Sequence, residues 1–117
     1  MKIKTSELTG AALNWAVAQC EGEKVELRQG AIRYVYSQFM PEPDVYDPST
    51  DDSLGGPIID RLRIRTEWSA LWSCWLAHDL RCAGVAFPGA TRLIAAMRCF
   101  VASKLGDEVD IPEELLK

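Results

Sequence analysis

The sequence lacks the short motifs that mark the common hydrolytic and nucleotide-binding sites. It contains no G-x-S-x-G, no P-loop lysine motif and no glycine fingerprint for a dinucleotide. It contains one histidine, His78, so a cysteine nucleophile would have only one imidazole available as its base. These absences favour a protein that is not an enzyme, and they predict no catalytic residue and no cofactor.

Long apolar runs are also absent. No stretch approaches the roughly 18 apolar residues that a membrane-spanning helix needs, and residues 1–5 do not resemble the apolar part of a signal peptide. We therefore expect a cytoplasmic protein with no membrane partner. In that compartment cysteines stay reduced, and as small apolar side chains they are expected in the core. The cysteines are Cys20, Cys74, Cys82 and Cys99.

The cysteines lack the paired C-x2-C spacing of structural zinc sites. Cys74, His78 and Cys82 do recur at every fourth residue, which on a helix would bring them to one side, with Cys99 as a fourth zinc ligand. We favour core cysteines beside a surface histidine, and therefore no metal. A catalytic pair of Cys74 and His78 is disfavoured because the sequence places no Asn or Asp to orient the imidazole.

A positive net charge, the usual mark of a dedicated nucleic-acid-binding protein, is missing as well. The 117 residues include 13 Lys and Arg against 17 Asp and Glu, a net charge of −4. Five basic and nine acidic side chains lie in 1–58, seven and three in 59–104, and one and five in 105–117, so the middle segment is basic. The hydrophobic share of 48% predicts one globular domain, 1–117, with a single core.

Residues 9–21 and 92–105 have the spacing of apolar residues that is typical of helices. We expect the first helix to end at Gly22, and the second to run from an N-cap at Thr91 to a stop at Gly106. The predicted core stripe of the second helix is Ile94, Met97, Val101 and Leu105.

Shorter alternating segments predict strands at 2–4 and 107–112, and a hairpin that joins 24–28 to 31–36. Together the elements predict an α+β fold, in which a small antiparallel sheet packs against the two main helices, 9–21 and 92–105.

Residues 66–82 fit two structures. Trp68, Leu71, Trp72 and Trp75 have helical spacing, with Thr66 as an N-cap. Alternate residues of the same segment also form an apolar face in a strand. We favour the helix on length, and the strand remains open.

Residues 37–56 are rich in proline, glycine and acidic side chains, and they predict a long loop that ends in a short helical turn at Pro57. Long loops often carry function, so this one is a place to look for a partner-binding surface. Its aspartates are Asp44, Asp47, Asp51 and Asp52. They lack the spacing of an EF-hand, so a solvated loop is favoured over a Mg²⁺ site.

Alternation from residue 60 onward predicts a strand with Arg61, Arg63 and Arg65 on one face. Arginines in a row can bind phosphates, and exposed tryptophans nearby can stack on bases. The simpler interpretation is that the tryptophans are buried and that the arginines keep the outer face of the strand soluble.

Three stretches resemble the NinX-like proteins of lambdoid phages and prophages. They are 1–18, then Pro-Ser-Thr-Asp at 48–51 with Gly-Gly-Pro-Ile-Ile at 55–59, and finally 93–109. The resemblance implies a protein made in the cytoplasm of a bacterial host. It implies no activity, because the function of the family is unknown.

The sequence departs from the family pattern in two places. Asp52 stands where relatives tend to have Trp, and Gly-Ala-Thr-Arg-Leu at 89–93 replaces Gly-Pro-Thr-Pro-Leu, which predicts a less rigid turn into the last helix. The segment 60–86 matches poorly, and in relatives a Trp-x-Ala stretch there looks like a strand.

We therefore expect a non-enzymatic phage accessory protein that binds a host or phage protein. The alternative is a nucleic-acid-binding protein that uses the arginine strand face. The sequence specifies no oligomeric state. The predicted interaction surface comprises Arg61, Arg63, Arg65, Asp44, Asp47, Asp51 and Asp52.

Overall fold

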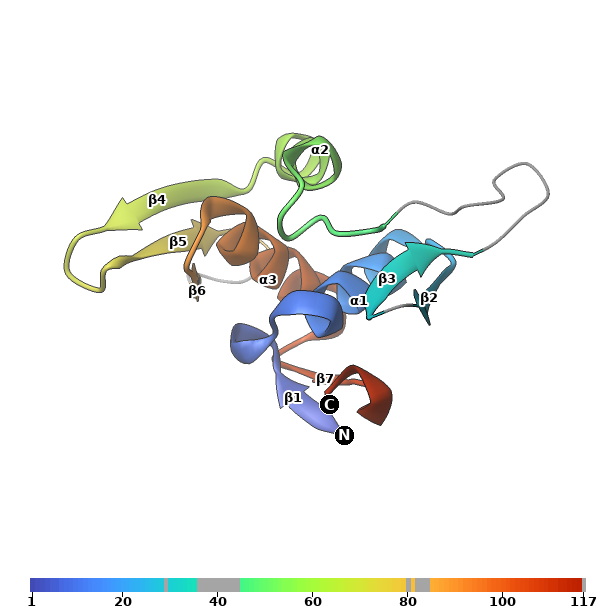
Figure 1. Cartoon of the computed structure of the whole chain (residues 1–117). Coiled ribbons are helices and arrows are strands. Elements are labelled where there is room, and N and C mark those ends of the chain that lie inside the picture. The colour runs from blue at the N-terminus through green and yellow to red at the C-terminus, as the bar shows by residue number, and fades with distance from the viewer. Residues whose placement is uncertain (29, 36–44, 80, 82–84, 117) are drawn as a thin grey trace.

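The computed structural model describes residues 1–28, 30–35, 45–79, 81 and 85–116. Its helices and strands are arranged around helix α3 (Figure 1). In chain order the elements are β1 (Lys2–Lys4), the 3-10 turn η1 (Thr5–Glu7), α1 (Gly10–Glu21), β2 (Val25–Arg28), β3 (Ala31–Tyr34), α2 (Asp52–Leu62), β4 (Arg65–Ser69), β5 (Cys74–His78), β6 (Ala86–Gly89), α3 (Arg92–Leu105), β7 (Glu108–Asp110) and the 3-10 turn η3 (Glu113–Leu115).

Helix α3 has the predicted bounds and both predicted ends. The Thr91 hydroxyl accepts a hydrogen bond from the Ile94 N–H (3.1 Å), and Gly106 follows the last turn with a φ of 89°. One residue of the expected core stripe is wrong: Leu105 is 42% exposed, because the last turn continues into exposed residues. The buried residues of α3 are Ala95, Ala96, Met97, Cys99, Phe100 and Val101.

Helix α1 packs against α3 and confirms the prediction for 9–21, including the left-handed Gly22 (φ 73°) that ends it. It carries one buried polar side chain, Asn14. The Asn14 Oδ1 accepts hydrogen bonds from the Ser49 N–H (3.1 Å) and the Ser49 Oγ (2.7 Å). Because a buried amide oxygen without donors would be costly, this pair fixes the chain before α2 against α1.

The strands form small antiparallel sheets with the orders β1-β7, β2-β3 and β4-β5-β6. The α+β class is confirmed, and so are the strand at 2–4, the terminal strand and the hairpin at 24–34. The expectation of one sheet is wrong. The hairpins pair locally, and β1 pairs with β7 from the other end of the chain, so helices α1 and α3 separate the sheets (Figure 1). None of the helices in the described ranges is long and apolar enough to cross a bilayer.

Helix α2, which runs from Asp52 to Leu62, corrects two predictions: the end of the loop over 37–56 and the start of the strand from residue 60. The Asp51 carboxylate starts this helix by accepting a hydrogen bond from the Ser53 N–H (2.9 Å), and the bonds from Ser53 lower the pKa of that carboxyl. Pro57 lies inside the helix rather than at its first turn. Residues 36–44 of the predicted loop lie outside the described residues.

Two neighbouring glycines of α2 have different surroundings. A Cβ on Gly55 would collide with the Pro48 carbonyl oxygen and lie 2.8 Å from the Leu93 Cδ2, so only glycine fits there. A Cβ on Gly56 would meet only the flexible Asp52 side chain, at 3.3 Å. Glycine at residue 55 is therefore a packing requirement, which allows α2 to lie close to α3.

The helix favoured for 66–82 is wrong, because residues 66–78 belong to the β4–β5 hairpin. Strand β6, which was not expected from the sequence, pairs with β5. Residues 80 and 82 lie outside the described residues. The helical prediction assumed that the tryptophans share one buried helix face. In the structure Trp68 and Trp72 are 55% and 71% exposed, so that assumption does not hold.

Arg98 on α3 joins two distant parts of the chain. Its Nε donates to the Leu8 carbonyl (2.7 Å) and its Nη1 donates to the Pro88 carbonyl (2.8 Å). Burial lowers the pKa of the Arg98 guanidinium, and the two carbonyls accept from two of its N–H groups. The charged side chain thus holds η1 and β6 against the same helix.

The glycine pair in α2 gives a matched test of this packing. We expect Gly55→Ala to lower the free energy of unfolding by about 1–3 kcal/mol, because the methyl group must displace backbone. Gly56→Ala is expected to be neutral or to stabilise by up to about 1 kcal/mol, because alanine favours helix and the nearby side chain can move. Urea unfolding followed by circular dichroism measures both, and equal effects of the two changes would contradict the packing described.

Candidate interaction surface

The β4–β5 hairpin has a four-residue turn, 70–73, set by two serines. In the antiparallel register Trp68 lies opposite Trp75, and Ser69 lies opposite Cys74. The Ser69 Oγ accepts a hydrogen bond from the Trp72 N–H (3.2 Å), and Ser73 takes a left-handed conformation (φ 52°). Short polar side chains tolerate such turns by bonding to nearby backbone groups.

Alternation along the strands gives the hairpin two different faces. The inner face, which packs toward α3, carries Thr66, Trp68, Trp75 and Ala77. The outer face carries Arg65, Glu67, Ser69, Cys74, Leu76 and His78. Ala77 is fully buried, and Gly89 of the neighbouring strand β6 approaches Ala95 of α3 so closely that a Cβ would lie 2.8 Å from the Ala95 Cα. The base of the hairpin is therefore fixed firmly on the core.

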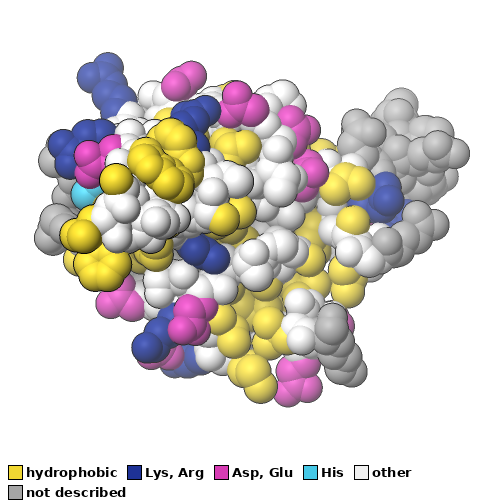
Figure 2. All heavy atoms as spheres, turned by 60° about the vertical axis from the view of Figure 1, so that its left-hand side comes forward, with side chains coloured by type: hydrophobic (Ala, Val, Ile, Leu, Met, Phe, Trp, Pro, Cys, Tyr) yellow, Lys and Arg dark blue, Asp and Glu magenta, His cyan; other side chains and the backbone are white. Residues whose placement is uncertain are grey.

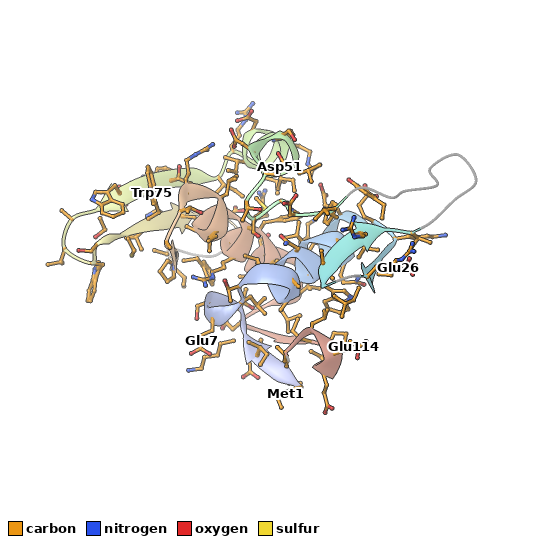
Figure 3. The ribbon with its side chains drawn as sticks, in the orientation of Figure 1. Met1, Glu7, Glu26, Asp51, Trp75 and Glu114 are labelled. Carbon is orange, nitrogen blue, oxygen red and sulfur yellow. The ribbon has the colours of Figure 1, made fainter. Side chains whose placement is uncertain are left out.

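The far end of the hairpin extends past α3 (Figure 1), and its large apolar side chains are exposed to solvent. Trp68, Leu71 and Trp72, which we call the hairpin tip, are 55%, 84% and 71% exposed. Trp75, labelled in Figure 3, is half-buried against the core and meets Trp68 edge to face, with ring centroids 6.0 Å apart. Figure 2 turns this end of the molecule forward and shows groups of hydrophobic side chains among charged ones.

Polar contacts hold the rest of the hairpin in place. On the outer face the Glu67 Oε1 lies 2.9 Å from the His78 Nε2. Beyond β5, the buried Asp79 carboxylate accepts hydrogen bonds from the backbone N–H and the guanidinium of Arg81, both at 2.9 Å. The same guanidinium donates to the Leu62 carbonyl at the end of α2 (3.2 Å). These bonds connect the base of the hairpin to α2.

The arginines predicted to share a strand face lie on three different kinds of backbone, so that expectation is wrong. Arg61 is in α2 and forms an ion pair with Glu21 (2.7 Å), a bond that raises the pKa of the guanidinium. Arg63 ends α2 in a left-handed conformation (φ 53°), and Arg65 begins β4. Arg63 and Arg65 are exposed and have no acidic partner among the described residues.

Three of the four predicted aspartates lie in the described residues, near the start of α2, and each of these three has a partner within the chain. Asp47 accepts from the Thr50 hydroxyl (3.0 Å), Asp51 caps α2, and Asp52 forms an ion pair with Arg92 (3.1 Å). Asp44 lies outside the described residues. The aspartates therefore stabilise local structure, and their contact with a partner stays a prediction.

A zinc site or a catalytic pair built on Cys74 and His78 required both residues on one face of a helix. These residues lie on strand β5 instead, so that arrangement is ruled out. Cys74 and His78 lie at opposite ends of β5, roughly 13 Å apart at the rise of a strand. Cys82 lies outside the described residues, and Cys99 is buried in α3. In the part of the chain that the structure describes, no group of three or more His, Cys, Asp or Glu side chains is placed to hold a metal ion.

The hairpin tip was not predicted from the sequence, because Leu71 and Trp72 were assigned to the apolar face of a helix. The signal that identifies them is the pair of serines at 69 and 73 on either side, which are typical of a turn.

Comparison with protein families gives a match over residues 4–104 to the model described as Bacteriophage P22, NinX. The matched range includes α1, α2, the β4–β5 hairpin and nearly all of α3. No curated protein matches the chain.

Replacing a tryptophan with alanine at the tip and at the base of the hairpin is expected to change the free energy of unfolding by different amounts. Trp72→Ala is expected to change the free energy of unfolding by no more than about 0.5 kcal/mol, because the ring is mostly in solvent. Trp75→Ala is expected to lower it by about 2–3 kcal/mol, because the ring packs on the core. Urea unfolding of both variants tests the assignment, and a Trp72 variant that is the less stable of the two would refute it.

Proposed function

The chain belongs to the NinX family of bacteriophage P22, and we propose that this phage accessory protein is a non-enzymatic interaction module that binds a protein through its hairpin tip. The observation that carries the proposal is the exposure of Trp68, Leu71 and Trp72 together at the end of one hairpin. The partner is a host or phage protein in the cytoplasm of the infected bacterium.

The energetics of the tip support this proposal. An exposed tryptophan contributes little to folding, and several large apolar side chains exposed on one surface commonly mark a site of interaction. Tryptophan is also enriched among the residues that dominate binding energy at protein interfaces. Because the base of the hairpin is packed on α3 and bonded through Asp79, a partner would meet a preorganised strand pair, which lowers the entropy cost of binding.

Two exposed arginines lie at the base of the hairpin, away from its tip. Arg63 and Arg65 are exposed at the point where the chain leaves α2 and enters β4. Interface rims are polar and change association rates more than final affinity. Trp68, Leu71 and Trp72 form the apolar centre of the proposed interface, and Arg63 and Arg65 lie outside that centre, where a charge affects the rate of association rather than the contact itself.

A second candidate function, nucleic-acid binding, is favoured by the exposure of Arg63 and Arg65 without acidic partners among the described residues. It ranks below protein binding for a geometric reason. Arg65 lies on the outer face of β4 and Trp68 on the inner face, so one strand of nucleic acid cannot readily contact both. Arg61 is neutralised by Glu21, and the net charge of −4 opposes phosphate binding.

The direct test compares recovery of partners from phage-infected cells by three tagged proteins: wild type, Leu71→Ser with Trp72→Ser, and Leu105→Ser. Leu105 is an exposed leucine at the end of α3 and serves as the matched control. We expect a specific protein to be recovered by wild type and by Leu105→Ser, and its yield to fall at least about tenfold in the tip variant.

Equal recovery by all three proteins, or no specific partner for any of them, would contradict the proposal. Salt-sensitive binding to DNA or RNA that is lost in Arg63→Gln with Arg65→Gln, but kept in the tip variant, would support the second candidate instead.

A further inference from the structure

A cavity of about 350 Å³ lies on another part of the molecule, between the start of α1, strand β3 and the chain that leads into α2. Its volume is in the range of small-molecule sites. Apolar side chains form one part of its wall, among them Ile32, Val45 and Ile94. The polar part of the wall includes the first turn of α1, Asn14 and Asp47.

The first turn of α1 offers backbone donors to this cavity. Thr9, Gly10 and Ala11 line it, and the Thr9 side chain makes no capping hydrogen bond. The first N–H groups of a helix have no acceptor within the helix, and they carry the positive end of its dipole. Gly10, the first residue of α1, is left-handed (φ 56°) and is followed by right-handed helical residues, an alternation in which successive N–H groups converge on an anion.

Asn14 gives independent evidence for a ligand. The side chain is 8% exposed, and its Oδ1 is fixed toward Ser49, because the Ser49 N–H can only donate. The Nδ2 therefore points away from Ser49, and it donates to no group among the described residues. Asn14 lines the cavity, and because Ser49 holds its Oδ1, we infer that the Nδ2 is the polar atom of this side chain that is left to serve a ligand there.

The charges of the wall narrow the class of ligand. Several donors converge at one end, which favours an acceptor with a negative charge. No lysine or arginine lines the cavity in the described residues, and the Asp47 carboxylate does, so a phosphate dianion is disfavoured. The apolar wall suits a hydrocarbon body.

We propose that this cavity binds a small carboxylate with an apolar body, held by the first-turn N–H groups of α1 and the Nδ2 of Asn14. The site is separate from the hairpin tip, so its test does not depend on the proposed protein interaction.

The test is a titration of the full-length ¹⁵N-labelled protein with 4-methylpentanoate, followed by NMR. We expect saturable shifts of the Asn14 side-chain amide and of the backbone amides of Gly10, Ala11 and Ala12, with millimolar affinity. The neutral 4-methylpentanol is expected to bind at least about tenfold more weakly, and inorganic phosphate is expected not to bind. Failure of the carboxylate to saturate these signals, or equal binding of the alcohol, would overturn the proposal.

Variants assign the binding to the cavity. Asn14→Asp keeps an acceptor oxygen for Ser49 but replaces the donor with a negative charge, and Ala11→Asp places a carboxylate where the ligand would bind. Each is expected to weaken 4-methylpentanoate at least about tenfold, while Gln19→Glu, an exposed change of the same charge on α1, leaves it unchanged. Since Asp is favourable in a first helical turn, Ala11→Asp tests the site even where Asn14→Asp does not fold. Unchanged affinity in Ala11→Asp would refute the site.

Discussion

Burial of helix α3 is the constraint on which the rest of the structure depends. Helix α1, helix α2 and the β4-β5-β6 sheet all pack against α3, whose buried residues lie between Ala95 and Val101 (Figure 1). Close packing sets the details: Gly55 lets α2 approach, and Gly89 lets β6 approach. Arg98 adds two hydrogen bonds that hold η1 and β6 to the same helix. Small sheets with few strands depend on packing for stability: β4-β5-β6 and β7 contact α3, whereas the β2-β3 sheet contacts α1, which itself packs on α3.

The same constraint explains how the molecule presents an apolar surface without losing stability. The β4–β5 hairpin has its base on α3 and its turn beyond it, so Ala77 is buried while Leu71 is 84% exposed. Folding requires the base of the hairpin, whereas the tip contributes little to the core. The tip is therefore the part of this phage protein whose apolar character is best explained by binding, and the proposed carboxylate cavity beside α1 adds a second site on other elements.

Local signals in the sequence were enough to predict α1, α3, the first hairpin and the terminal strands. Thr91 and Gly106, for example, are chemical signals for the two ends of α3. Helix α2 could not be predicted in the same way, because Gly55, Gly56 and Pro57 are poor helix formers and only its packing explains them. The apolar residues of 66–82 fit a helix and a strand equally well in pattern. Their exposure at the tip arises because the turn of the hairpin lies beyond α3, and this depends on tertiary packing rather than on local sequence.

The central claim is that the hairpin tip contacts a protein partner in infected cells. The most direct measurement replaces Trp72 with a benzophenone amino acid and irradiates cells during infection, with the same replacement at Leu105 as the control. We expect a cross-linked protein of defined mass from position 72 and none from position 105. Cross-linking to nucleic acid alone, or the same products from both positions, would contradict it.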